Sequence, residues 1–142
     1  MHAGNVQSLM EAGDFSAASN ILANQLAALD AGNHAQNNTH TNDTDGATSL
    51  DTKRERIEAL YLSAVCARYQ DDFSRARGFI QNIFDIEPFL GRGFLEEAHI
   101  CRAEGKAREA LSNYQRASEA NPAILAAWRE QIKILDASDQ AA

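Results

Sequence analysis

In the second half of the chain the hydrophobic positions recur with the spacing of amphipathic helices. Apolar side chains return every three or four positions over 94–102, and a Glu-Gly-Lys turn centred on Gly105 then interrupts the pattern. A second helix is predicted over 107–120, and it ends at Pro122 because the residue before a proline disfavours helical backbone. These signals predict a helix–turn–helix unit.

The same pattern occurs 34 residues earlier, where Pro88 takes the place of Pro122. The apolar residues before each proline match at this offset: Ala76 with Ala110, Ile80 with Tyr114 and Ile83 with Ala117. Helices are therefore predicted over 55–69 and 74–86. A repeat of this length predicts an all-α solenoid, in which neighbouring units bury one another's apolar faces.

A more divergent unit precedes these two, with a short helix through residues 6–10 and a second helix over 16–29. Its turn residue Gly13 lies 58 residues before its counterpart Asp71, which is one repeat plus 24 residues. The surplus falls on 31–54, a polar tract without periodicity that is predicted to form a mobile loop. Such a loop is either functional or a tolerated insertion.

After the last repeat a single helix is predicted over 124–136, without a second helix to complete the pair. Its polar residues Arg129, Glu130, Lys133 and Asp136 fit a capping helix, which needs one polar face. The alternative is that this unfinished edge pairs with another copy, giving a homodimer through the C-terminal helix. The chain then forms a single domain with these parts: a degenerate repeat over 1–30, the insertion over 31–54, repeats over 55–88 and 89–122, and a cap and tail over 123–142.

The repeats resemble the tetratricopeptide repeat (TPR). The residues that carry the resemblance are Gly105, Glu109-Ala110-Leu111, Tyr114-Gln115, Ala117 and Asn121-Pro122. The first helices depart from the family pattern, since Ala64 and Ala98 replace the usual glycine and Ala67 and Cys101 replace a large aromatic residue. Asp71 takes the turn slot that is glycine in the family. The resemblance implies a non-catalytic, scaffold-like module for protein–protein interaction.

Residues 92–105 and 121–135 are also similar to the repeats that precede the catalytic domain in bacterial TPR-sulfotransferases. The sulfate-donor binding region of those enzymes is absent from this sequence. This second resemblance implies an alternative function, as an accessory or oligomerisation domain detached from a larger enzyme.

The net charge of −7 is unevenly placed, because residues 1–52 carry six acidic residues and no Lys or Arg. A sequence pI near 5.0 argues against nucleic-acid binding, which needs a dense basic face. No apolar run approaches the ~20 residues that cross a bilayer, so no membrane association is predicted. The N-terminus shows no export signal, and a cytoplasmic location is expected.

The sequence holds no nucleophile, nucleotide or metal motif, so no catalytic residues, no cofactor and no metal are predicted. Cys66 and Cys101 lack CxxC spacing and are interpreted as small buried side chains. The segment 41–46 faintly resembles a calcium loop, but it begins on Thr41, and Thr52 stands where a bidentate Glu would close the site.

In the tetratricopeptide family the first helix of each pair lines a concave groove. Carried over residue by residue, the resemblance gives these groove residues: Tyr61, Arg68, Arg92, Leu95, His99, Arg102, Arg129 and Lys133. Because Arg binds carboxylates in bidentate fashion, the predicted ligand is a protein or peptide segment of acidic character. The alternative is that these cations pair with neighbouring carboxylates such as Glu55, Glu58, Glu96 and Glu97.

Overall fold

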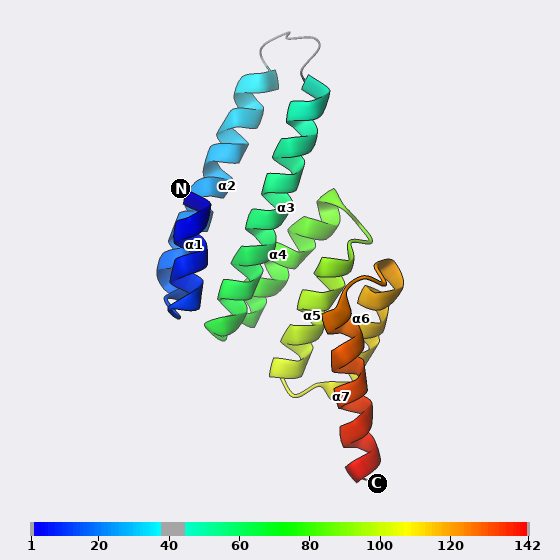
Figure 1. The fold of residues 1–142 in the computed structure, drawn as a ribbon. Coiled ribbons are helices and arrows are strands. Elements are labelled where there is room, and N and C mark those ends of the chain that lie inside the picture. Colours follow the sequence, from blue (N-terminus) through cyan, green and yellow to red (C-terminus); the bar gives the residue numbers. More distant parts are fainter. Residues whose placement is uncertain (1, 38–44, 142) are drawn as a thin grey trace. The chain divides into compact units, whose positions relative to one another are not determined.

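The computed structural model describes residues 2–37 and 45–141, and within these ranges the chain is helical without any strand (Figure 1). The helices are α1 (His2–Glu11), α2 (Phe15–Asn37), α3 (Asp45–Tyr69), α4 (Phe73–Ile86), α5 (Gly91–Ala103), α6 (Ala107–Ala120) and α7 (Leu125–Ala141). Helices that follow one another pack together, α1 with α2, α2 with α3, α5 with α6 and α6 with α7. Contacts divide the chain into two compact units, Met1–Phe79 and Ile80–Ala142. The predicted all-α helical-repeat fold is confirmed.

Three turns share one left-handed backbone conformation. Gly13, Asp71 and Gly105 have φ angles of 84°, 61° and 81°. After each, the next N–H bonds the carbonyl five residues back: Asp14 to Leu9, Asp72 to Ala67 and Lys106 to Cys101, at 2.8–2.9 Å. This is the Schellman pattern of a helix C-terminus, which places a positive φ at the residue after the cap. The three turns that the repeat predicts, including Asp71 in a glycine slot, are confirmed.

The residue after each turn immediately precedes the next helix. The Asp14 carboxylate accepts the N–H of Ala17 at 3.2 Å, and the Asp72 carboxylate accepts the N–H of Arg75 at 3.3 Å. Both are N-cap bonds, which satisfy one of the free donors of the first helical turn. Lys106 occupies this place before α6 and makes no side-chain cap.

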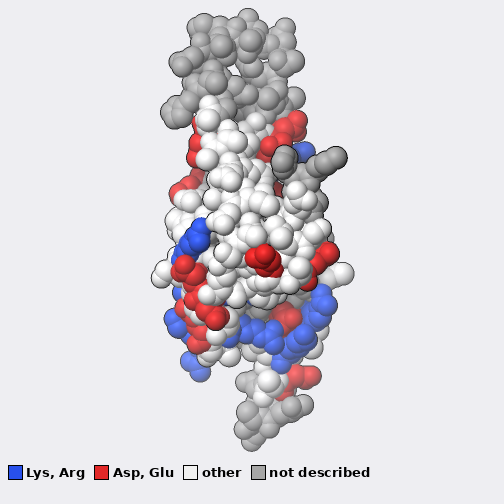
Figure 2. Space-filling view, turned by 90° about the vertical axis from the view of Figure 1, so that its left-hand side faces the viewer, with Lys and Arg blue, Asp and Glu red and all other residues white. Residues whose placement is uncertain are grey.

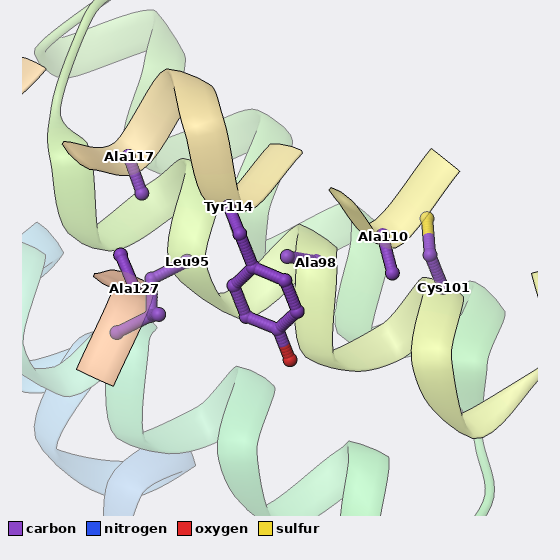
Figure 3. Close-up of a cluster of buried hydrophobic side chains, with 7 residues drawn as sticks. All are labelled: Leu95, Ala98, Cys101, Ala110, Tyr114, Ala117 and Ala127. Carbon is purple, nitrogen blue, oxygen red and sulfur yellow. The ribbon is translucent and has the colours of Figure 1, made fainter. Parts of the chain in front are cut away.

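In the unit Ile80–Ala142 the core surrounds Tyr114, which is fully buried on α6 (Figure 3). The other buried members of this core are mostly small: Leu95, Ala98, Cys101, Ala110, Ala117 and Ala127. Small side chains on α5, α6 and α7 let the three helices approach closely around one large ring. The close-up shows that ring at the centre, between Ala98 on one side and Leu95 with Ala127 on the other.

Close packing in this unit also requires a glycine. A Cβ added at Gly93 on α5 would lie 2.7 Å from the Phe84 ring on α4. The Phe84 ring also contacts the Phe94 ring, whose centroid stands 5.0 Å away. Only glycine fits this position without movement of the ring.

In the unit Met1–Phe79 a second core lies among α1, α2 and α3. Its buried members are Val6, Ala18, Leu22, Ala59 and Cys66. The Phe15 and Tyr69 rings stack at 4.6 Å with an interplanar angle of 3°, beside the turn that ends α3. This stacking joins the first residue of α2 to the last residue of α3.

A glutamine joins consecutive helices in each unit. The amide of Gln70, the residue after the end of α3, donates to the Ser19 hydroxyl at 3.2 Å and, more weakly, to the Phe15 carbonyl at 3.5 Å, both on α2. The Gln131 amide on α7 donates to the Ser118 hydroxyl at 3.0 Å and the Tyr114 carbonyl at 3.3 Å on α6. In both cases the second acceptor lies four residues before the serine, so the same contact recurs at two places.

The predicted loop over 31–54 is wrong at both of its ends. Helix α2 continues to Asn37, and α3 begins at Asp45, while 38–44 lie outside the described residues. Lengthening an existing helix needs no new nucleation, so a polar tract next to a packed helix can continue it. An ion pair between Asp30 on α2 and Arg56 on α3 joins the two helices near this extension. No described helix combines the length and the apolar character needed to cross a bilayer.

Candidate functional site

The predicted groove residues belong to two different units. Tyr61 and Arg68 lie on α3, where both are partly buried. The Arg68 guanidinium stands over the Tyr69 ring at 4.7 Å from its centroid, which orients this cation. The other six residues lie on α5 and α7 of the unit Ile80–Ala142. A groove that includes both sets stays a prediction.

Two of those six take part in the interior of their unit. Leu95 is predicted to line an open groove, but it is 8% exposed and belongs to the core around Tyr114. The expectation fails because α7 covers this side chain, and Ala127 of α7 belongs to the same cluster. His99 Nδ1 lies 2.7 Å from the Tyr114 hydroxyl, and the two rings meet edge to face at 5.3 Å. His99 therefore satisfies the one polar atom of the buried ring.

The cations Arg102 and Lys133 meet at one carboxylate, that of Glu130 on α7. Arg102 at the end of α5 pairs with Glu130 Oε2. Lys133, one turn after Glu130 on α7, places its Nζ 3.3 Å from Glu130 Oε1. The Glu130 side chain is 13% exposed, whereas those of Arg102 and Lys133 are 47% and 56% exposed. Each carboxylate oxygen thus has one cation, and both cations remain reachable from solvent.

A cavity of about 380 Å³ opens beside these cations. Its lining residues are Arg102, Gly105, Ala107, Lys133, Ile134 and Ala137. The α5–α6 turn forms one wall, where the positive φ of Gly105 sets the path of the chain, and α7 forms the opposite wall. The site that we call the α7 carboxylate site, Arg102, Glu130 and Lys133, therefore combines charge with an adjoining space that is largely apolar.

Arg92 and Arg129 complete the predicted set. Arg92 lies partly buried in the first turn of α5, and Arg129 is exposed on α7. On the face shown in Figure 2, Lys and Arg side chains gather in the lower part of the view with Asp and Glu side chains among them. Lys106 follows this mixed pattern, because its Nζ lies 3.6 Å from Glu104 Oε1. Pairs between cations and neighbouring carboxylates therefore occur in this unit, as the alternative interpretation of the sequence predicts. Glu130, however, is not among the carboxylates that the sequence suggests as partners.

Both cysteines are buried free thiols, as interpreted from the sequence. Burial raises the pKa of the Cys66 thiol, and a hydrogen bond with the Ser19 side chain opposes this rise. A raised pKa keeps the sulfur protonated and weakens it as a nucleophile. Among the described residues no three His, Cys, Asp or Glu side chains are placed to hold a metal ion. The candidate calcium segment 41–46 lies outside the residues whose side chains are described.

Sequence reasoning missed the residues that organise this site. Glu130 was assigned only to a polar outer face, and Gln131 was not singled out. The spacing of Glu130 and Lys133 is one helical turn, which is a readable sign of an ion pair. The contacts of Glu130 with Arg102 and of Gln131 with Ser118 join different helices, so a local pattern cannot reveal them.

No family model matches the sequence, and no curated protein matches it either. A solved structure with a similar fold is the C-terminal TPR-containing domain of a putative FK506-binding protein from Plasmodium falciparum. The TM-score is 0.66 at 16% sequence identity, and the match covers 99% of this chain and 87% of that domain. The chain therefore has the helical-repeat fold of a tetratricopeptide-repeat domain.

Proposed function

We propose that this chain is a non-catalytic interaction module that binds a short acidic segment of another protein. Its fold supports an interaction module, because stacked helix pairs present extended surfaces to partners. The observation that carries the acidic preference is the α7 carboxylate site, where Arg102 and Lys133 hold the carboxylate of Glu130.

Glu130 serves in this proposal as an internal stand-in for a ligand. A carboxylate of the incoming segment displaces it from Arg102, whose planar guanidinium can bind both oxygens of one carboxylate. Lys133 supplies a second charge that follows the carboxylate on a flexible stem. A neighbouring apolar side chain of the ligand enters the adjoining cavity and packs against Ile134 and Ala137.

Two of the remaining predicted groove residues, Arg92 and Arg129, add positive charge in the same unit. Tyr61 and Arg68 lie on α3 in the other unit, and their part in ligand binding stays a prediction. His99 fixes Tyr114 and so supports the helix pair from inside. The free thiols Cys66 and Cys101 fit a reducing compartment, in keeping with a cytoplasmic module.

The proposal predicts binding of an acidic peptide that depends on both cations. The probe is a fluorescein-labelled peptide of six glutamates with a free C-terminus, measured by fluorescence anisotropy at low salt. We expect the double variant Arg102→Glu/Lys133→Glu to weaken binding by more than tenfold, because two attractive charges become repulsive. The variant should keep its helical circular dichroism, since both side chains are about half exposed.

The matched control is Arg108→Glu/Arg116→Glu, which makes the same change of charge on exposed positions of α6. If binding depends on the net charge alone, peptide affinity falls equally in both double variants. That result would contradict a specific site at Arg102 and Lys133. Equal binding of a six-lysine peptide would contradict it as well. Affinity purification with Arg92→Glu/Arg102→Glu and Arg116→Glu would then identify the natural partner.

The alternative function, as an accessory or oligomerisation domain of a larger enzyme such as a TPR-sulfotransferase, stays a prediction. One observation favours self-association within it: α7 exposes a row of large apolar side chains.

A further inference from the structure

Helix α7 presents two different faces. One face packs on its own unit through Ala127, Gln131 and Ile134, which contact the core or α6, and Ile124 just before the helix packs on the same core. The adjacent face carries Leu125, Trp128, Ile132 and Leu135, which are 73%, 45%, 63% and 51% exposed. We call these four residues the α7 apolar row. Its members are among the most exposed large hydrophobic residues in the described part of the chain.

The apolar row has the spacing of a coiled-coil seam. Its intervals are three, four and three residues, as for the a and d positions of a heptad repeat. Such a seam is buried by another helix with the same spacing of apolar residues. Helix α7 of a second copy of the chain has this spacing, because the two sequences are identical. A two-fold symmetric contact also needs a surface that complements itself.

The polar atom of the exposed Trp128 ring already has a hydrogen-bond partner within the chain. Its indole N–H donates to the Pro122 carbonyl at 3.0 Å, so the one polar atom of the ring already has a partner. Covering the ring then leaves no unsatisfied donor, and the side chain is held in place before any contact forms. A buried aromatic anchor of this kind dominates the energy of many interfaces.

The flanking charges indicate the direction of the pairing. In an antiparallel pair of α7 helices the a and d layers place Leu125 against Leu135 of the second copy, and Trp128 against Ile132. The e positions that flank this seam are Arg129 and Asp136, and antiparallel helices bring e positions together. Arg129 of each copy then faces Asp136 of the other, twice by symmetry.

A parallel pair lacks this complementarity. It sets e positions against g positions, so Arg129 would face Ile124 and Asp136 would face Gln131. Among the described residues neither Arg129 nor Asp136 makes an ion pair within the chain, so both charges are open to an external partner. The seam and the charges together favour the antiparallel arrangement.

We propose that the chain forms a homodimer through antiparallel pairing of α7 with α7 of a second copy. The inference does not depend on the acidic-peptide proposal, because the α7 apolar row and Asp136 take no part in the α7 carboxylate site. The two proposals share only Arg129. A single helix pair is a small interface, and small interfaces associate weakly, so a dissociation constant on the order of 10 μM is expected.

The test uses the full chain and a charge swap. Sedimentation velocity from about 1 to about 200 μM should show a monomer–dimer equilibrium for the wild type. Arg129→Asp and Asp136→Arg should each weaken self-association by about tenfold, because each replaces two attractive pairs by two repulsive ones. An equimolar mixture of the two variants should dimerise as well as the wild type, since opposite charges then face each other again. Trp128 is the only tryptophan, so its emission should shift to shorter wavelength on association.

The controls distinguish this contact from non-specific hydrophobic association. Ile132→Glu should abolish the dimer, whereas Phe89→Ser should leave it unchanged although Phe89 is 81% exposed in the same unit. A wild type that stays monomeric at the highest concentration would overturn the proposal. So would two single variants whose mixture remains monomeric, or a dimer that depends on Phe89.

Discussion

Two glycines, on α4 and α5, respond oppositely to the same substitution. A methyl group at Gly93 meets the Phe84 ring at 2.7 Å, whereas one at Gly78 meets nothing within 4 Å. Gly93→Ala is expected to lower the free energy of unfolding by about 1–3 kcal/mol through overpacking. Gly78→Ala should raise it by about 0.5–1 kcal/mol, because alanine favours the helix interior. Urea unfolding followed by circular dichroism compares the two, and equal shifts would contradict the packing around Phe84.

The sequence predicts the interior of the repeats well at the level of single residues. Ala110, Tyr114 and Ala117 were matched to the preceding repeat and are all fully buried. Leu95 was placed on the surface because the family pattern describes one pair of helices and omits what the next helix covers. The contacts of Glu130 and Gln131 could not be predicted for the same reason, since their partners lie on α5 and α6.

At the scale of the element, the turns provide the clearest evidence for a repeat. Three segments with different residues adopt one backbone, and two of them use glycine where the third has Asp71. A non-glycine residue in the left-handed region costs about 1 kcal/mol or more, although Asp tolerates it better than most. The equivalence of the turns is therefore open to a direct test by exchange of residues.

Asp71→Gly should raise the free energy of unfolding by about 0.5–1 kcal/mol, because it relieves this cost at φ of 61°. A change in the opposite sense at the equivalent turn, from glycine to a residue with a side chain in Gly105→Ala, should lower the free energy of unfolding by about 1 kcal/mol. Thermal unfolding followed by circular dichroism measures both. If Asp71→Gly destabilises the chain while Gly105→Ala does not, the two turns are not equivalent.

The ends of α2 and α3 show where element prediction fails. Composition alone indicated a loop over 31–54, since the tract is polar and lacks apolar periodicity. Helix continuation depends on the packed helix that precedes the tract and on long-range contacts such as that of Asp30 with Arg56. Neither is visible in a window of the sequence itself.

At the scale of the whole molecule, the 34-residue period accounts for the fold. It places small residues where helices meet and positive φ angles where the chain turns, and these few positions suffice for a fold shared at 16% identity with a TPR-containing domain. The same period carries no information on the ligand. Function has to be sought in the residues that differ between repeats, above all the charges of α5 and α7.

Two of those charges, Arg102 and Lys133, meet at Glu130, so the central claim is that this carboxylate occupies the place of a ligand. The most direct measurement is the anisotropy of the labelled six-glutamate peptide with wild type and with Glu130→Gln. The amide leaves the shape nearly unchanged and frees Arg102 and Lys133, so the account predicts binding at least several-fold tighter than in the wild type. Unchanged or weaker binding by Glu130→Gln, with the helical fold intact, would show that Glu130 only ties α5 to α7.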